Sequence, residues 1–229
     1  MESNNPIIQL QDINVFQQDH LVLSGVTLAI NKGEFVFLIG QTGSGKSSLL
    51  KTIYGDLKIS QGTGEVVGYS LTTIKEKEVP FMRRKMGIVF QDFQLLTDRS
   101  VEDNLKFVMS ATGWDDAKMI AARSEEVINE VGLAGKNHKM PHQLSGGEQQ
   151  RVVIARAMVN HPAVILADEP TGNLDPDSSV EIMNLLLKIS KMGTAVVMAT
   201  HDYRMIEKFP SRIIKCEKGK IIEDHYQTV

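Results

Sequence analysis

The 229-residue sequence contains a single cysteine, Cys216, so no internal disulfide can form. It lacks any charge-free apolar run near the ~20 residues that a helix needs to cross a bilayer. Its first residues, Met1 to Pro6, also lack the basic and then apolar layout of a signal peptide. We therefore expect a chain in the reducing cytosol that acts at a membrane only through a partner.

The chain also lacks an excess of basic residues. It carries 25 Lys and Arg against 28 Asp and Glu, a formal net charge of -3. The cluster Arg83-Arg84-Lys85 is local, and we interpret it as a solvated face at the end of a helix. Because nucleic-acid binding usually needs a broad basic surface, we expect no nucleic-acid partner.

Hydrophobic residues make up 42% of the chain, enough for a sizeable core. Short runs rich in Val and Ile predict strands at Ile7 to Leu10, Val22 to Ile30, Phe35 to Ile39, Met86 to Phe90, Val164 to Ala167, Ala195 to Met198 and Arg212 to Cys216. Helical patterns follow several of them, at Lys46 to Tyr54, Ala117 to Val131, Glu148 to Val159 and Ser178 to Ser190. This alternation favours an α/β fold with a largely parallel sheet covered on both faces.

Two regions depart from the alternation of strands and helices. The first strands have no helix between them, so we expect an antiparallel strip near the amino terminus. Residues 95–159 are mostly helical, which predicts a separate lobe beside a core made of residues 1–94 and 160–229. There is no tandem repeat or long linker, so we expect one domain over residues 1–229.

A glycine-rich segment follows the predicted strand Phe35 to Ile39 and opens a helix, the context that a P-loop requires. It consists of Gly40, Gln41, Thr42, Gly43, Ser44, Gly45, Lys46 and Ser47, with Ser48 next to it. Its backbone N–H groups can surround phosphate oxygens. Lys46 would reach the β- and γ-phosphates of ATP, and Ser47 would bind Mg²⁺. The alternative, a glycine-rich turn with an accidental lysine, does not explain this spacing and context.

A P-loop would also suit a small-molecule kinase or a GTPase, and a second motif decides between these classes. The apolar run Ala163 to Ala167 ends in two acidic residues, Asp168 and Glu169. Asp168 can hold the Mg²⁺ shell, and Glu169 can polarise water. Adjacent carboxylates at the end of a buried strand are costly without a cation, which disfavours an incidental surface pair.

A third motif is the string Leu144-Ser145-Gly146-Gly147-Glu148-Gln149-Gln150-Arg151. Ser145 can cap the helix that follows while free N–H groups face an anion. The whole string resembles the signature motif of the ABC ATPases, and a plain helix cap would explain Ser145 alone. The resemblance implies a P-loop NTPase (RecA-like) core, an ABC-type helical lobe, and a head-to-tail homodimer in the ATP-bound state. In that dimer, Ser145, Gly146, Gly147 and Glu148 meet the ATP of the other subunit.

Further positions match the family in order along the chain. Gln91 resembles the Q-loop glutamine that touches Mg²⁺ and water, Asp175 in Asn173-Leu174-Asp175 resembles the D-loop residue, and His201 resembles the switch histidine. Phe16 stands where the family usually has an aromatic residue that stacks on adenine. A lone Gln, Asp or His is more often structural, and Phe16 could belong to the core, so these roles rest on the resemblance.

Two strings resemble the cell-division members of this family, namely Gly33 to Leu38 and Phe93 to Val101, although Ser100 stands where those members usually have Thr. The string Ala167 to Asp175 also occurs in lipoprotein-release and macrolide-export ATPases, which remain an alternative. The resemblance implies a polytopic membrane partner that regulates cell-wall hydrolysis, and a location on the inner face of the plasma membrane. A short helix of that partner would dock beside the Q-loop, where Phe93, Leu95, Leu96 and Met109 are candidate lining residues. Packing inside the helical lobe explains any one of these four side chains at least as well.

Two other functional classes are alternatives to a membrane-coupled ATPase. A DNA-repair or chromosome ABC ATPase would carry long coiled coils between P-loop and signature, and the segment between Lys46 and Ser145 has no sustained heptads. The other class is a nucleotide-binding scaffold with incidental hydrolysis. Glu169 and His201 count against an inert scaffold but are compatible with a slow enzyme.

Overall fold

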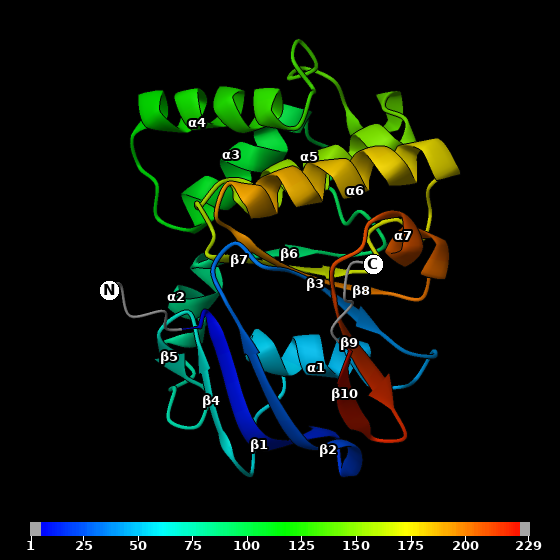
Figure 1. The fold of residues 1–229 in the computed structure, drawn as a ribbon. Helices are drawn as coiled ribbons and strands as arrows, with labels where there is room; N and C mark the ends of the chain where they lie inside the picture. Colours follow the sequence, from blue (N-terminus) through cyan, green and yellow to red (C-terminus); the bar gives the residue numbers. More distant parts are fainter. Residues whose placement is uncertain (1–5, 225–229) are drawn as a thin grey trace.

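The computed structural model describes residues 6–224, and its strands form two sheets (Figure 1). The larger sheet has the order β10-β9-β3-β8-β7-β6. Its strands are β3 (Phe35–Ile39), β6 (Met86–Val89), β7 (Val164–Asp168), β8 (Ala195–Thr200), β9 (Arg212–Glu217) and β10 (Lys220–Asp224). All neighbours pair in parallel except β10, which is antiparallel to β9 at the edge.

The parallel strands are buried on both faces. Every residue of β3 and β8 is buried, as continuous apolar runs predict. Alternate residues of β3 belong to two different cores, because side chains alternate across a strand. Phe37 packs with the helices on one face, whereas Val36 and Leu38 pack with the smaller sheet on the other. The predicted α/β fold with a covered parallel sheet is confirmed.

The smaller sheet is antiparallel and has the order β2-β1-β4-β5, which confirms the predicted strip. It contains β1 (Ile8–Gln17), β2 (His20–Ile30), β4 (Thr63–Val66) and β5 (Tyr69–Ser70). The predicted first strand, ending at Leu10, was too short. Pairing with β2 is irregular between Leu10 and Phe16, and Asp12 has a positive φ of 51°, so the simple alternation of apolar residues is interrupted there.

Seven α-helices lie among the described residues: α1 (Lys46–Ile53), α2 (Val79–Arg84), α3 (Val101–Ala111), α4 (Ala117–Glu130), α5 (Gly146–Met158), α6 (Pro176–Lys191) and α7 (Tyr203–Lys208). The short 3-10 helix η1 (Pro141–Gln143) precedes α5. In Figure 1, α1 lies between the two sheets, while α3, α4, α5 and α6 lie together beyond the opposite face of the larger sheet. No helix within residues 6–224 is long and apolar enough to cross a membrane.

Several smaller predictions can be compared with the structure. Cys216 is buried in β9, the predicted late strand, and burial raises the pKa of its thiol to about 11. The basic cluster does end helix α2, but Arg83 and Arg84 are half-buried and so are not a fully solvated face. Residues 1–5, which carry most of the segment predicted not to be a signal peptide, lie outside the described residues.

The backbone of β6 lies very close to α5, and Gly87 permits this approach. A Cβ added at Gly87 would lie 2.7 Å from the carbonyl oxygen of Ala157 and 3.0 Å from its Cβ. A carbonyl oxygen in a helix cannot move aside as the end of a side chain can. The packing of the helical region on the parallel sheet therefore depends on a residue without a side chain at this position.

We expect Gly87→Ala to lower the free energy of unfolding by about 1–3 kcal/mol, because it overpacks this contact. Denaturant unfolding measures the loss. Gly64→Ala in β4 is the matched control and should cost less, since the nearest atoms to a Cβ there are side-chain methyl groups. They belong to Leu10, Leu71 and Ile59, at 3.1, 3.2 and 3.5 Å. Equal stability of the two variants would contradict this account.

Candidate functional site

The predicted site residues of the core gather at one edge of the larger sheet. The P-loop follows β3, Asp168 and Glu169 end and follow β7, His201 follows β8, and Gln91 lies just beyond β6. These four strands are parallel and adjacent, in the order β3-β8-β7-β6. Their carboxyl ends therefore meet at the same edge, where ligands of open α/β sheets bind.

The P-loop has a backbone that side chains would obstruct. Gly40, Gly43 and Gly45 have positive φ values of 152°, 79° and 101°, all in the region that favours glycine. A Cβ at Gly40 would lie 2.4 Å from Ser44 Oγ. Ser44 Oγ is itself buried and has no hydrogen-bond partner among the described residues. Such an atom is costly unless a ligand supplies a partner, which fits a phosphate-binding loop.

Lys46 is buried in the first turn of α1 and is held inside the P-loop. Its Nζ donates to the carbonyl oxygens of Gly40 and Gln41, at 2.8 and 3.3 Å. A hollow of about 300 Å³ lies alongside, and Gly43, Gly45, Lys46, Ser47, Ser48, Gln17, His20, Val22 and Lys51 line it. A cation at the amino-terminal end of a helix, beside an open hollow, attracts an anion.

Asp168 lies close to the P-loop. Burial raises the pKa of its carboxyl, Ser47 opposes this rise by hydrogen bonding to it, and the neighbouring Glu169 raises it further. A carboxylate and a hydroxyl in contact are hard oxygen donors of the kind that Mg²⁺ prefers. No group of three or more His, Cys, Asp or Glu in residues 6–224 could hold a metal without further ligands. Ser47 and Asp168 together offer two oxygen donors of this kind.

Glu169 and His201 form a direct contact at the same edge. His201 Nδ1 lies 2.7 Å from a carboxylate oxygen of Glu169, and the His201 side chain is 60% exposed. Glu169 has a φ of 50°, a conformation that is uncommon for a residue with a side chain and that recurs at functional sites. A second hollow of about 300 Å³ is lined by both residues and by the D-loop segment. The pair therefore places a carboxylate and an imidazole together at the edge of this hollow.

Gln91 touches the D-loop of its own chain. Its side-chain nitrogen donates to the side-chain oxygen of Asn173 at 3.4 Å, and Asn173 donates back to the Gln91 carbonyl at 3.3 Å. A Cβ on Gly172 would lie 2.9 Å from the Gln91 side chain. The described residues give Gln91 no contact with Ser47 or Asp168, so its metal-binding role remains a prediction.

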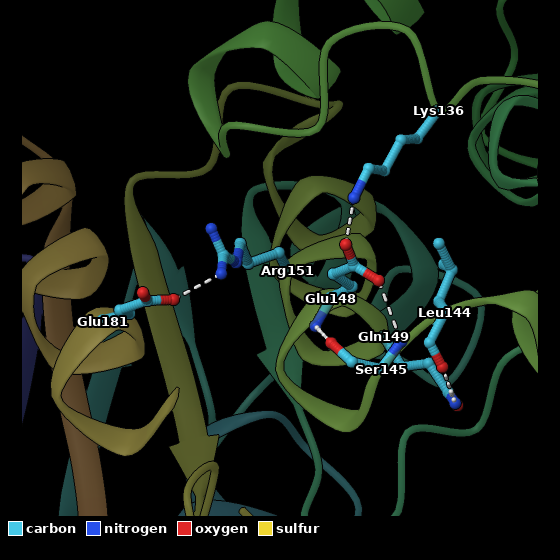
Figure 2. Close-up of polar contacts among 7 residues, drawn as sticks. All are labelled: Lys136, Leu144, Ser145, Glu148, Gln149, Arg151 and Glu181. Atoms are coloured by element: carbon cyan, nitrogen blue, oxygen red, sulfur yellow. Dashed lines mark hydrogen bonds and ion pairs between the residues drawn. The ribbon is translucent and has the colours of Figure 1, made fainter. Parts of the chain in front are cut away.

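The signature segment begins α5 with a reciprocal cap (Figure 2). Ser145 Oγ accepts from the Glu148 N–H at 3.2 Å, and the Glu148 carboxylate accepts from the Ser145 N–H at 2.8 Å. Glu148 also pairs with Lys136, and this ion pair together with the cap lowers the pKa of Glu148. The predicted helix cap is present, and it holds the signature loop in one conformation.

The signature helix also packs tightly on α6, and a second ion pair joins Arg151 to Glu181 of that helix (Figure 2). A Cβ on Gly147 would lie 2.8 Å from Ser178 Oγ in the first turn of α6. Asp175 caps this helix by accepting from the Ser178 N–H at 2.9 Å, and hydrogen bonds from Ser178 lower its pKa. Gly147 and Asp175 thus have structural roles within the chain.

The signature segment and Phe16 are two predicted parts of the site that the structure does not bring to the P-loop of the same chain. No described contact joins the signature residues Ser145 to Glu148 to the P-loop of the same chain. Phe16 is half-buried in β1 opposite Leu21, and Gln17, not Phe16, lines the hollow beside Lys46. Stacking of Phe16 on adenine therefore remains a prediction.

Two polar residues that hold the backbone near Gln91 were not predicted from the sequence. Arg156 in α5 donates to the carbonyls of Phe93 and Gln94, just beyond Gln91. Asn104 is fully buried in α3 and bonds the backbone at Leu96 in both directions. Each lies within a helical pattern that also suits a surface residue, so only the fold identifies it.

Comparisons with known proteins agree with this arrangement. Residues 23–172 match the family described as ABC transporter. The cell division ATP-binding protein FtsE of Bacillus subtilis (strain 168) is 48% identical over 202 residues, covering 88% of each chain. FtsE of Streptococcus pneumoniae serotype 2 is 43% identical over 219 residues, covering 95% of each chain. FtsE of Escherichia coli (strain K12) is 45% identical over 201 residues, 87% of this chain and 89% of that protein.

Solved structures give the same result. The cbiO1 protein from Clostridium perfringens, part of the ABC transporter complex cbiONQ, has a TM-score of 0.88 at 30% identity, covering 96% of this chain and 89% of that chain. The ATP-binding cassette MJ0796, in a dimeric post-hydrolysis state bound to ADP and Pi, has a TM-score of 0.83 at 32% identity, covering 97% of this chain and 100% of that chain. The predicted resemblance is confirmed, and the chain belongs to the ABC transporter family of ATP-binding cassettes.

Proposed function

We propose that this ATPase binds ATP at the P-loop and hydrolyses it with Glu169 as the general base. The observation that carries the proposal is the contact between Glu169 and His201 at the same sheet edge as Lys46 and the Ser47–Asp168 pair. Lys46 would leave its two carbonyl partners and bind the β- and γ-phosphates. Glu169 would then accept a proton from the attacking water while His201 fixes its orientation.

Mg²⁺ is part of this proposal, and Ser47, Asp168 and Gln91 would hold it. When bound, it neutralises charge on the phosphate oxygens. Asp168 must be ionised to bind a cation, and Ser47 favours that state by donating to it. Gln91 would reach the ion only after its contact with Asn173 is released.

We also propose that two chains share each ATP. The support is geometric, because the signature loop lies apart from the P-loop of its own chain while Ser145 is exposed. The solved cassette MJ0796, 32% identical to this chain, is described as dimeric. Residues 1–94 with 160–229 would form the core of a single nucleotide-binding domain, and residues 95–159 would present the signature loop to the partner subunit.

We further propose that the chain is the ATPase subunit of a cell-division complex in bacteria, with a polytopic membrane partner resembling FtsX. The support is the identity of 43–48% to proteins named FtsE over most of the chain. ATP-driven dimerisation would change the conformation of the partner and so regulate cell-wall hydrolysis from the inner face of the plasma membrane. A lipoprotein-release or macrolide-export subunit and a scaffold with incidental hydrolysis are the alternatives.

The surface predicted for partner docking needs correction. Met109 is fully buried in the helical region, so it cannot line a docking groove. Phe93 and Leu95 are half-buried and pack against the same core, and Leu96 is half-buried. A groove of about 410 Å³ does lie next to the Q-loop, but its apolar lining includes Phe90, Val108 and Ala111. We propose this groove as the docking site of the membrane partner.

The base assignment is tested by Glu169→Gln, which keeps the shape of the side chain but cannot accept a proton. We expect ATP binding to persist and the hydrolysis rate to fall by about 10²–10⁴. Filter binding and phosphate release measure the two quantities, and gel filtration with ATP should detect a trapped dimer. Hydrolysis at the wild-type rate would show that another group is the base.

The shared site is tested by Ser145→Arg, which should block the signature loop while leaving ATP binding by the monomer intact. Mixing this variant with Lys46→Ala protein should restore hydrolysis, because each heterodimer then holds one complete site. Ser100→Ala controls for loss of a cap, since Ser100 caps α3 in the same way and its loss should cost about 1 kcal/mol. If Ser145→Arg monomers fail to bind ATP, the shared site is wrong.

Docking in the groove is tested by Ala111→Trp, which fills the groove from an exposed position on α3. We expect co-sedimentation with membranes that contain an FtsX-type protein to fall several-fold, and ATP hydrolysis by the free protein to fall much less. Ser110→Trp is the matched control, because Ser110 is exposed on the same helix and does not line the groove. Unchanged sedimentation of a folded Ala111→Trp protein would remove this surface from the proposal.

A further inference from the structure

The groove beside the Q-loop is cationic as well as apolar. Most of its lining residues belong to α2, β6, α3 and the end of α5. Three arginines line it, Arg83, Arg84 and Arg156, and none of the lining residues is acidic. A purely apolar helix would leave these guanidinium groups against hydrocarbon, which is unfavourable.

Only Arg83 of these three has an acidic partner among the described residues. Its Nη2 lies 3.6 Å from Asp56, and its Nε donates to the carbonyl of Tyr54 at 2.9 Å. Arg83 is therefore already compensated. The positive charge that remains in the groove comes from Arg84 and Arg156.

Arg84 reaches across the groove toward the end of α3. Its guanidinium carbon lies 4.7 Å from the centre of the Phe81 ring, and Nη1 would lie 3.8 Å from a Cβ built on Gly113. The carbonyl end of α3 carries only about half a negative charge, shared over several groups. It compensates Arg84 only in part, and the described residues give Arg84 no acidic partner.

Arg156 is held by two neutral carbonyl groups, those of Phe93 and Gln94. Burial lowers the pKa of Arg156, the expected effect of removing a cation from water without a counter-charge. Carbonyl oxygens offer partial charges, whereas a carboxylate would offer a full one and could accept two parallel N–H bonds. Arg84 and Arg156 therefore lack a full negative charge opposite them among the described residues.

We propose that the groove receives a segment of the membrane partner that carries a carboxylate side chain, placed against Arg84 and Arg156, next to apolar side chains that meet Val108 and Phe90. This inference rests on the proposed docking function and names the chemistry of its occupant. The apolar lining favours a protein segment over a free anion, because an inorganic ion would gain nothing from Val108, Ala111 and Phe90. Arg84 and Arg156 also disfavour partners that carry no carboxylate at this position.

The test measures binding of the full chain to an FtsX-type membrane protein in nanodiscs of uncharged lipid. Arg84→Glu should weaken binding about tenfold or more, and Asp or Glu→Arg in a cytoplasmic helix of that protein should restore it. Lys85→Glu is the matched control, with the same change of charge one residue away. Lys85 is exposed, does not line the groove, and points toward Val67 and Tyr69. Melting curves check that both variants are folded.

Each result decides between the two proposals. If the wild-type chain binds and Arg84→Glu binds equally well, or if Lys85→Glu loses as much binding, the carboxylate contact is wrong while docking stands. If the wild-type chain does not bind the membrane protein at all, the docking function itself is wrong. Equal binding to empty nanodiscs of anionic lipid would assign the arginines to lipid headgroups and overturn the inference.

Discussion

The parallel arrangement of β3, β8, β7 and β6 is the constraint on which the site depends. Because neighbouring parallel strands end at the same edge, four segments far apart in the sequence meet there without any long-range motif. The P-loop and His201 each follow such a strand directly, and the acidic pair spans the end of a third. Burial of β3 and β8 on both faces fixes these strand ends, so the geometry of the phosphate site follows from the packing of the two cores that share β3.

The signature loop does not follow a strand of this sheet, and its position depends on a different set of contacts. Residues 172–178 touch Gln91 at one end and the signature helix at the other, through Asn173 and Ser178 respectively. The Arg151–Glu181 ion pair joins α5 to α6 one turn further along. Movement of α6 would therefore affect both the Q-loop and the signature loop, which in the proposed dimer would contact two different ATP molecules.

The features that could be predicted from the sequence are those that depend on short segments of the chain. The buried strands, the glycine turn before α1 and the cap at Ser145 each depend on neighbours within a few residues, and all three appear in the structure. The sequence did not predict β1 beyond Leu10, because a bulge interrupts the alternation there. It left the burial of Met109 open, because a helical period alone cannot say which of two apolar faces is covered. Gln91–Asn173 pairing and the two carbonyl contacts of Arg156 required the tertiary structure. They join residues more than 60 positions apart.

The contacts of Arg156 also connect the groove to the catalytic edge. This side chain lines the groove and, at the same time, holds the backbone two and three residues beyond Gln91. A carboxylate that drew the guanidinium toward the groove would compete with those two carbonyl groups for its N–H donors. Loss of these bonds would loosen the Q-loop, in which Gln91 pairs with Asn173. Occupancy of the groove and the position of Gln91 would then be linked through one side chain, and linkage of this kind acts in both directions.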